Sequence, residues 1–221
     1  MNVCIIIPAY NESVRIKSVL REISRTGFDV IVVDDGSSDD TARAASEFPV
    51  KLLEHAVNLG QGAALKTGTE LAHQLGYEII VHFDGDGQHR VEDIVSLVEI
   101  LKNEDVDVAL GSRFMGLESN YSLKKKIILN LAKIFSKKFL QLNFTDPQSG
   151  LRAFKSRVLP QLNWTADDFL HASEILNLII KNKLKYKEIP IQVNYDEHTS
   201  NKKVKPRMNM GWKMLIGKIF R

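Results

Sequence analysis

Short apolar runs alternate with segments of helical periodicity along the first half of the chain. The runs are followed by Gly, Asp, Asn or Ser, which are the residues that end strands and form turns. Five strands are predicted, at residues 3–8, 29–34, 50–54, 78–84 and 107–114. Because these runs are apolar at successive positions, both faces of the strands should be covered, as they are in a parallel sheet.

The segments between these runs are amphipathic. The first carries apolar residues at i, i+3, i+4 and i+7, the spacing of one helical face: Ile16, Val19, Leu20 and Ile23. Similar faces predict helices at residues 60–76 and 91–101, and a short helix that ends near Phe48. Strands that alternate with helices predict an α/β fold, with a Rossmann-like, mostly parallel sheet and helices on both faces.

The second half of the chain has a different pattern. It predicts a long basic helix, a loop, a short strand, a helix and a last strand, at residues 121–144, 145–150, 151–154, 167–183 and 187–195. No internal repeat or low-complexity linker separates these elements. The simplest organisation is one domain, residues 1–198, followed by a basic amphipathic tail, residues 199–221.

Composition places the chain among soluble globular proteins, with 44% hydrophobic and 26% charged residues. No stretch of 18 apolar residues predicts a membrane span, and the N-terminus reads as a strand instead of a signal peptide. The one cysteine, Cys4, lies within that strand. We expect it to be a small core residue of a protein in a reducing compartment.

Basic residues are concentrated in two segments. Residues 121–144 carry six Lys and residues 199–221 carry seven Lys or Arg, with no acidic residue in either, so the rest of the chain has a balance of −10. In both segments Lys and Arg flank an apolar stripe, which is typical of helices that lie in a membrane interface. The alternatives are core packing for the first segment and docking on a partner subunit for the second. The acidic body argues against nucleic acid as a partner.

Three predicted strands end in polar sequences, PAYNE (8–12), DDGSSD (34–39) and DGDGQH (84–89). Surface turns use these residue types for backbone reasons alone. However, the carboxyl ends of neighbouring parallel strands lie at one edge of a sheet, where α/β proteins bind ligands. Three such sequences together therefore predict one shared ligand site.

Asp84 and Asp86 form an unfavourable pair unless something binds them. Side chains at i and i+2 of a strand point the same way, about 7 Å apart, so two carboxylates repel by roughly 2–3 kcal/mol at an effective dielectric near 20. The chain has no Gly-rich dinucleotide or Walker-type phosphate motif. A diphosphate held through Mg²⁺ or Mn²⁺ explains the pair best, and a solvated acidic turn is the alternative.

Six motifs in order carry a resemblance to a known family: PAYNE, VDDGSSDDT, NLGQGAALKTG, FDGDGQH, GSRF and TDPQSGLRAF. Over residues 2–195 the chain resembles the inverting family 2 glycosyltransferases with a GT-A fold. Within them it is most similar to the polyprenyl-phosphate sugar transferases. This resemblance implies a metal-dependent transfer of a sugar from a nucleoside diphosphate sugar.

The resemblance also implies which residues hold the nucleoside: Pro8, Tyr10, Glu12, Val33 and Asp35. Carboxylates suit this role because an ionised carboxylate accepts hydrogen bonds from ribose hydroxyls or from a base N–H group.

The D-x-D element of the family corresponds to Asp84, Gly85 and Asp86. The resemblance implies that it binds the metal–diphosphate, with Asp84 and Asp86 as metal ligands and Gln88 as a further oxygen ligand. Lys66 is expected near the same site, where it packs or forms a pair and does not react.

The implied reaction is attack of an acceptor oxygen on the anomeric carbon with inversion. The resemblance implies that Asp86, through the metal, and Arg113 stabilise the negative charge that develops on the leaving diphosphate. A structural salt bridge is the alternative role for Arg113. A lipid phosphate acceptor is already an anion, whereas a sugar hydroxyl needs a general base, for which Asp146 and Glu174 are the candidates. Asp146 could instead cap the turn before Pro147, and Glu174 could line its helix.

The chain departs from the family pattern after the last strand. Many relatives carry an arginine and then a lysine there, both directed at phosphates. This sequence has Asp196, Glu197 and His198 instead, so Lys202 or Lys203 is expected to take over that contact.

The expected substrates are a UDP- or GDP-linked sugar and an undecaprenyl or dolichyl phosphate. The expected location is peripheral, on the cytoplasmic face of a membrane, alone or with a separate membrane protein. Two other functions stay open, sugar transfer to a hydroxyl of a cell-surface glycan and a nucleotide-sugar-binding scaffold without activity. Aspartyl-phosphate chemistry fits less well because its acidic pair would follow the first strand and not the fourth.

Overall fold

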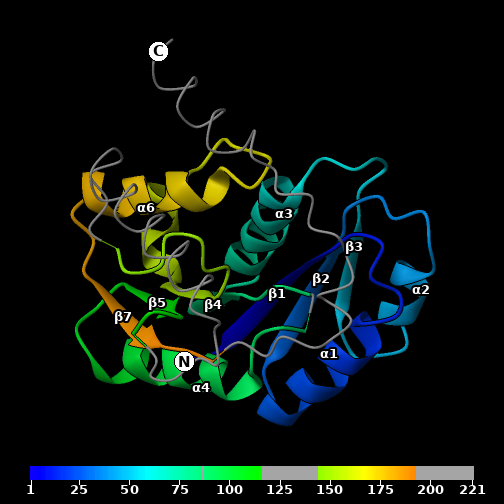
Figure 1. Ribbon diagram of the computed structural model, residues 1–221, viewed down its shortest axis with the longest axis horizontal. Coiled ribbons are helices and arrows are strands. Elements are labelled where there is room, and N and C mark those ends of the chain that lie inside the picture. The colour runs from blue at the N-terminus through cyan, green and yellow to red at the C-terminus, as the bar shows by residue number, and fades with distance from the viewer. Residues whose placement is uncertain (86, 116–143, 193–221) are drawn as a thin grey trace, which may run out of the picture.

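A seven-stranded sheet runs through the computed structural model of the protein, which describes residues 1–85, 87–115 and 144–192 (Figure 1). The strands are β1 (Val3–Ala9), β2 (Asp29–Asp34), β3 (Lys51–Glu54), β4 (Ile79–His82), β5 (Val108–Ser112), β6 (Arg152–Lys155) and β7 (Tyr186–Pro190). Their order across the sheet is β3-β2-β1-β4-β6-β5-β7. The five strands predicted in the first half all form, and so do the two predicted in the second half.

All strand pairs are parallel except those of β6, which runs antiparallel to β4 and β5. The expectation of a mostly parallel sheet is confirmed. The reversed direction of β6 has a consequence for the site, because β6 begins at the edge where β4 and β5 end. The loop that precedes β6, residues 145–150, therefore lies at the carboxyl edge of the parallel strands.

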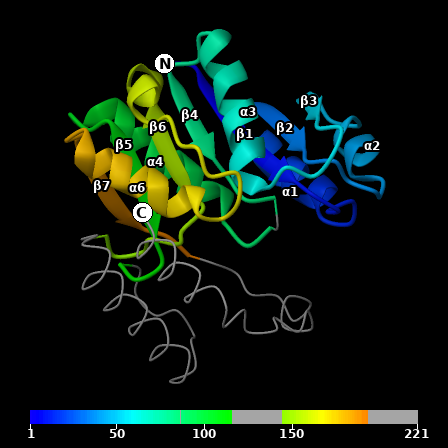
Figure 2. The same ribbon diagram turned by 90° about the horizontal axis from the view of Figure 1, so that it is seen from above.

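Helices cover both faces of the sheet (Figures 1 and 2). One face packs against α1 (Ile16–Ile23), α2 (Thr41–Ala45) and α4 (Val91–Asn103). The opposite face packs against α3 (Gln61–Gln74), α6 (His171–Lys181) and the 3₁₀ helix η2 (Ser156–Gln161). A second 3₁₀ helix, η1 (Ser24–Thr26), continues α1. The result is a doubly wound three-layer fold with a separate hydrophobic core on each side of the sheet.

The periodicity of the sequence predicts the inward faces of the helices well. In α1 the buried residues are the four predicted from their spacing: Ile16, Val19, Leu20 and Ile23. Cys4 is fully buried in β1, as expected of a core residue, and burial, together with the charge of Asp29, raises its pKa to about 12.

Element boundaries differ from the predictions by a few residues. α2 ends at Ala45 and not near Phe48, and α6 begins at His171, because residues 165–170 form a loop against the start of α3. The described part of β7 ends at Pro190. The predicted helix at 121–144, except for its last residue, and the tail at 199–221 lie outside the described residues. Among the helices that the structure describes, none is long and apolar enough to cross a bilayer.

Candidate active site

A cavity of about 440 Å³ opens at the carboxyl edge of β1, β2 and β4. Six residues predicted from the sequence line it: Pro8, Tyr10, Glu12, Asp35, Asp84 and Gly85. The loop before α3 and the start of α3 complete the lining, with Asn58, Gly60 and Gln61. The cavity exists because β1 extends past the pairing of β4 with β1, which ends at Ile6 and His82. The three polar strand ends therefore meet at one site, as expected.

We call Tyr10, Glu12 and Asp35 the β1–β2 side of the cavity. On this side, the Asp35 carboxylate accepts hydrogen bonds from the loop before α3. Its Oδ2 accepts a hydrogen bond from the Gly60 amide at 2.7 Å, and its Oδ1 accepts one from the Leu59 amide at 3.0 Å. The neighbouring Asp34 points elsewhere, since its Oδ1 accepts hydrogen bonds from the amide and hydroxyl of Ser37. Asp34 thus stabilises the turn after β2, whereas Asp35 lines the cavity.

His55 supports Asp35 from behind, a role that the sequence did not predict. Its Nδ1 lies 2.7 Å from Asp35 Oδ1 and its Nε2 lies 3.0 Å from Thr67 Oγ1, and both side chains of the His55–Asp35 pair are at least nine-tenths buried. The imidazole therefore connects the loop at the end of β2 to helix α3. An ionised carboxylate offers about four acceptor sites. Three donors occupy part of this capacity, which leaves room for a donor group of a ligand.

Tyr10 and Glu12 extend the β1–β2 side toward solvent. The Tyr10 side chain is exposed at the rim, whereas Glu12 Oε2 accepts a hydrogen bond from Arg15 Nη1 at 2.8 Å. The Glu12 amide donates to Thr41 Oγ1, which fixes the loop after β1 against α2. An aromatic ring and a held carboxylate at the rim match the chemistry of a base and a ribose.

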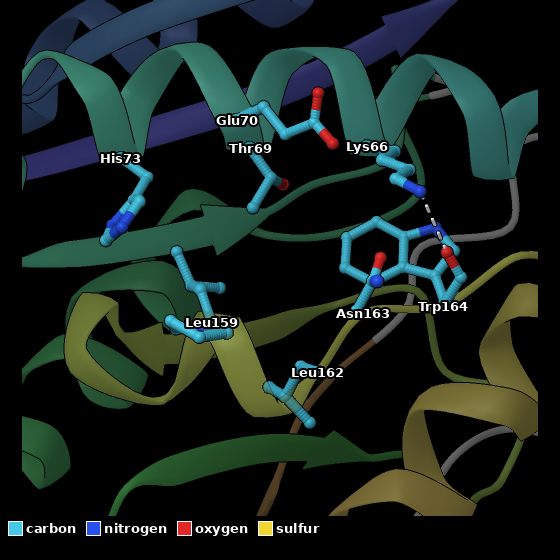
Figure 3. A pocket seen from close by; sticks show the side chains of 9 residues that line it. Lys66, Thr69, Glu70, His73, Leu159, Leu162, Asn163 and Trp164 are labelled. Atoms are coloured by element: carbon cyan, nitrogen blue, oxygen red, sulfur yellow. Dashed lines mark hydrogen bonds between the residues drawn. The ribbon is translucent and has the colours of Figure 1, made fainter.

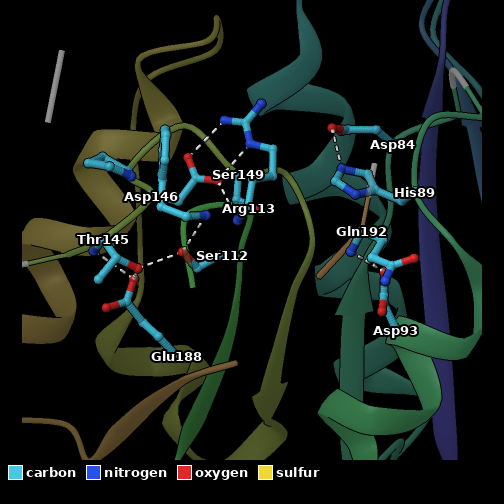
Figure 4. Close-up of polar contacts among 12 residues, drawn as sticks. Asp84, His89, Asp93, Ser112, Arg113, Thr145, Asp146, Ser149, Glu188 and Gln192 are labelled. Carbon is cyan, nitrogen blue, oxygen red and sulfur yellow. Dashed lines mark hydrogen bonds and ion pairs between the residues drawn. The ribbon is translucent and has the colours of Figure 1, made fainter. Parts of the chain in front are cut away.

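Asp84 stands at the end of β4 on the other side of the cavity. Its Oδ1 accepts a hydrogen bond from Gln61 Nε2 at 2.7 Å, and its Oδ2 lies 3.7 Å from His89 Nε2 (Figure 4). Burial alone would raise the pKa of Asp84. The hydrogen bond and charge of His89 and the charges of His171 and Arg152 outweigh burial and hold the pKa below its usual value. Asp84 is therefore an ionised carboxylate at neutral pH.

Gly150 gives the Asp84 carboxylate its space. A Cβ atom at position 150 would lie 2.0 Å from Asp84 Oδ2, so no other residue type fits there without moving the aspartate. On its other side the chain after β4 passes close to β1, where a Cβ atom on Gly85 would lie 3.1 Å from the Pro8 carbonyl oxygen. The Asp84 carboxylate thus lies between the ends of β1 and β4 and the loop before β6.

The donor set around Asp84 fits a hard divalent cation. Asp84 is ionised, its side chain is one-quarter exposed, and the cavity gives it room for further oxygen ligands. Within the described residues no three His, Cys, Asp or Glu side chains form a metal site by themselves. Asp86, the second expected ligand, lies outside the described residues. Gln88 is half-buried in the same loop and has interactions of its own.

Arg113 and Asp146 form a bidentate ion pair at the end of β5 (Figure 4). Arg113 Nε donates to Asp146 Oδ2 at 2.6 Å and Nη2 donates to Oδ1 at 2.7 Å, while the Arg113 amide also donates to Oδ2 at 3.0 Å. The Asp146 side chain is 1% exposed and that of Arg113 is 22% exposed. We call Asp84, Arg113 and Asp146 the β4–β5 side of the site.

A second network holds the loop that carries Asp146. Thr145 Oγ1 lies 2.6 Å from Ser112 Oγ and donates to Glu188 Oε1 at 2.7 Å, and the Thr145 amide donates to the same oxygen at 2.8 Å (Figure 4). Glu188 comes from β7 and Ser112 from β5. The loop before β6 is thus fixed to the end of β5 and to the middle of β7, two strands that are far apart in the sequence.

Six predicted site residues that the structure describes do not line the cavity: Val33, Lys66, Gln88, Arg113, Asp146 and Glu174. Val33 is fully buried and its side chain faces Gly68 of α3, so it belongs to the core. Lys66 lines a separate cavity of about 310 Å³ between α3 and η2, where its Nζ donates to the Trp164 carbonyl oxygen at 3.3 Å (Figure 3). Both positions result from the helical and strand periods, which turn these side chains away from the carboxyl edge.

Glu174 also lies away from the cavity lining. Its Oε2 accepts a hydrogen bond from the Ala166 amide at 2.8 Å, and both of its oxygens lie 3.0 Å from the Thr165 amide nitrogen. The carboxylate therefore secures the loop before α6. That loop packs on α3, since the Ala63 amide donates to the Asp167 carbonyl oxygen at 3.1 Å. Lys202, the remaining predicted residue, lies outside the described residues.

Carboxylates and amide donors that gather at the carboxyl edge of a doubly wound sheet define the class of α/β proteins that bind nucleotides there. The family within this class follows from the sequence. The chain belongs to glycosyl transferase family 2, whose model, "Glycosyl transferase family 2", matches residues 4–162.

Two curated relatives resemble the chain over most of its length. The UDP-N-acetylglucosamine–dolichyl-phosphate N-acetylglucosaminyltransferase of Methanococcus voltae is 35% identical over 240 residues, 98% of this chain and 92% of the relative. The polyprenol monophosphomannose synthase of Mycolicibacterium smegmatis is 27% identical over 200 residues, 85% of this chain and 75% of the relative. Both names describe the transfer of a sugar to a lipid phosphate.

A solved structure shares the fold. The glucosyl-3-phosphoglycerate synthase of Mycobacterium tuberculosis, in complex with Mn²⁺, UDP and glucosyl-3-phosphoglycerate, superposes with a TM-score of 0.67 at 18% identity. The match covers 90% of this chain and 74% of that one. The expected GT-A fold is thereby confirmed.

Proposed function

We propose that the protein is an inverting glycosyltransferase that moves a sugar from a nucleoside diphosphate sugar to a polyprenyl phosphate at a membrane surface. The observation that carries this proposal is the cavity that Asp35 and Asp84 share. One carboxylate suits the hydrogen-bond donors of a nucleoside, and the other suits the cation that accompanies a diphosphate. The two curated relatives, named for lipid-phosphate acceptors, support the choice of acceptor.

On the β1–β2 side, Asp35 would accept a hydrogen bond from the base or the ribose. Its position is fixed before the ligand arrives by His55 and by the amides of Leu59 and Gly60. Such preorganisation reduces the loss of side-chain freedom on binding. Tyr10 and Glu12 would line the path of the same nucleoside to the rim.

On the β4–β5 side, Asp84, Asp86 and Gln88 would hold Mg²⁺ or Mn²⁺. When bound, the cation would offset the negative charge that develops on the leaving diphosphate. Arg113 would add a second positive charge, since Asp146 holds its guanidinium at the end of β5. The Arg113 side chain is 22% exposed, which supports a role for its guanidinium toward a phosphate.

The hydrogen bonds of the two candidate bases, Asp146 and Glu174, bear on the choice of acceptor. Both oxygens of Asp146 accept hydrogen bonds from Arg113, and both oxygens of Glu174 accept hydrogen bonds from backbone amides. These hydrogen bonds disfavour the use of either carboxylate as the base that takes a proton from a sugar hydroxyl. A phosphate oxygen needs no such base because it is already an anion, and this favours a lipid phosphate.

The donor and the location are further parts of the proposal. UDP-N-acetylglucosamine is the first donor to test, because it gives the Methanococcus voltae relative its name. The basic segments at 121–144 and 199–221 would bring the enzyme to the cytoplasmic face of the membrane, with or without a membrane-protein partner.

The test is a donor and acceptor panel with the purified full chain in mild detergent, with Mn²⁺ or Mg²⁺ and polyprenyl phosphate. Release of nucleoside diphosphate and chromatography of the lipid are followed together. We expect release from one donor that depends on both the lipid phosphate and the metal. Metal-dependent nucleotide binding with no lipid-dependent release from any donor would contradict the acceptor assignment.

A further inference from the structure

Arg152 is a buried cation at the beginning of β6 that the sequence did not single out. The residue is 3% exposed. Its Nε donates to the Ser149 carbonyl oxygen at 3.0 Å, Nη1 to the Ala172 carbonyl oxygen at 3.0 Å and Nη2 to the Pro147 carbonyl oxygen at 3.3 Å. The guanidinium therefore bonds to three carbonyl groups from two segments, the loop before β6 and the first turn of α6.

These partners are unusual for a buried guanidinium, because buried charges are normally paired with opposite charges. Burial lowers the pKa of Arg152 to about 10, and the charges of Asp84 and Asp146 act in the opposite direction. Arg152 thus remains protonated at neutral pH. Its positive charge is near enough to Asp84 and Asp146 to interact with their charges. Its hydrogen bonds go to carbonyl oxygens and not to a carboxylate, among the residues that the structure describes.

The loop that Arg152 holds lies next to Asp84 and Arg113. Residues 147–149 are followed by Gly150, which lies against Asp84, and are preceded by Asp146, which holds Arg113. A shift of this loop would change the positions of Asp84 and Arg113 together. Figure 4 shows Asp146 beside Arg113, with Asp84 on the other side of Arg113 in this view.

We propose that Arg152 is a positioning residue for the diphosphate end of the donor. Its guanidinium fixes the loop at 147–149 to α6, sets the places of Asp84 and Arg113, and adds positive potential behind them. This inference rests on the proposed function only in assigning a diphosphate to this side. The β1–β2 side, built around Asp35 and His55, does not depend on Arg152.

The first test measures hydrogen exchange in the metal-free protein. Arg152→Met removes the three donors, and Arg157→Met is the matched control, because Arg157 lies in η2 with an exposed side chain and pairs with Asp107 at 2.8 Å. In the Arg152 variant, we expect faster exchange of peptides that cover 145–151 and the start of α6, by about 10-fold or more. Exchange of β1 and β2 should be unchanged. A uniform increase over the whole sheet would overturn the positioning role.

The second test separates the two sides of the site by ligand, without lipid. Binding of uridine and of UDP with Mn²⁺ is measured by calorimetry, with guanosine and GDP where the donor panel selects them. In Arg152→Met we expect nucleoside affinity within about twofold of the wild type, and Mn²⁺–diphosphate affinity lower by about 10-fold or more. Because no acceptor is present, this result is independent of whether the lipid phosphate is the substrate.

Turnover completes the test. Arg152→Met should lower kcat by about 100-fold, the loss typical of a misplaced reacting group, with KM for the acceptor little changed. If this variant does not fold, Arg152→Lys is tested in its place. Lysine keeps the positive charge but lacks the planar guanidinium that donates to three carbonyl oxygens at once. A folded Lys variant with wild-type exchange at 145–151 and wild-type diphosphate binding would overturn the proposal.

Discussion

The two sides of the active site are built in different ways. The β1–β2 side is local, because Tyr10, Glu12 and Asp35 follow directly from two neighbouring parallel strands. The β4–β5 side is assembled from distant parts of the chain, since Arg113 meets Asp146 across 33 positions and Gly150 meets Asp84. A site can therefore combine a binding surface set by strand ends with a charged surface set by long-range ion pairs. Substitutions should affect the two in different ways.

The largest effect is expected from Asp84→Asn. Loss of the charge that would hold the metal should reduce turnover by about 1,000-fold, the upper range for removal of one electrostatic group. Nucleoside binding without metal should be unchanged, because Asp35 and its partners stay in place. Steady-state kinetics and calorimetry with the nucleoside measure both quantities, and Glu92→Gln on the exposed start of α4 is the control. An equal loss of nucleoside affinity would contradict the division of the site.

Arg113→Met should separate stability from catalysis. It leaves the buried Asp146 charge without its bidentate partner, so we expect a loss of about 3 kcal/mol in the free energy of unfolding and about 100-fold in turnover. The double variant Arg113→Met with Asp146→Asn removes the unpaired charge. It should recover most of the stability and none of the turnover, as urea unfolding and kinetics would show. Recovered turnover in the double variant would exclude Arg113 from phosphate stabilisation.

Asp35→Asn should act on binding and leave the chemical step intact. Hydrogen bonds to charged groups contribute about 1.5–3 kcal/mol, so the donor KM should rise by about 10- to 100-fold with little change in kcat. Initial rates over a range of donor concentrations test this. A fall in kcat at saturating donor would mean that the β1–β2 side participates in the reaction step.

The free energy of unfolding should depend on pH through His171. Burial, followed by the charge of Arg152, lowers the pKa of His171 below 6.5 despite its hydrogen bond to the Asp168 carbonyl oxygen. Below pH 6.5 the unfolded chain binds a proton that the folded protein resists, so stability falls by up to about 1.4 kcal/mol per pH unit until the folded pKa is reached. Urea titrations at pH 7.0 and 5.5 should show a smaller loss in His171→Phe. Equal losses would contradict this assignment.

Glu174→Gln is expected to have the smallest effect. A glutamine keeps one acceptor for the amides of Thr165 and Ala166, so we expect turnover within about threefold of the wild type and a stability loss of about 1 kcal/mol. Rates and thermal unfolding measure the two effects. A loss of turnover of 100-fold or more, with the fold intact, would restore Glu174 as a general base and point to a hydroxyl acceptor.

The difference between the local β1–β2 side and the β4–β5 side, which distant segments assemble, also explains which parts of the site the sequence could predict. The strand ends of β1, β2 and β4 are readable because a buried apolar run and the polar residues after it are adjacent in the chain, and parallel pairing brings them to one edge. The three motifs that hold six lining residues were predicted in this way, and the resemblance to the family then implied the individual residues. The inward faces of the helices were predicted for the same local reason, their period of 3.6.

Contacts between distant segments could not be predicted. The direction of β6 depends on how the chain returns to the sheet after residue 115, and no local pattern encodes it. For this reason the pairing of Arg113 with Asp146 and the burial of Arg152 were missed, although a lone arginine in the apolar run LRAF was a signal. His55 and Glu174 act through backbone and loop partners that only the folded structure brings together.

The proposed function requires that this site transfers a sugar to an acceptor that is already an anion. The most direct measurement compares polyprenyl phosphate with the polyprenol of the same chain length, using the same donor, metal and detergent. We expect a sugar-bearing product from the phosphate and none from the alcohol. Comparable transfer to the alcohol would contradict this, because a general base would then be needed, and Asp146 or Glu174 would have to act despite the hydrogen bonds that it accepts.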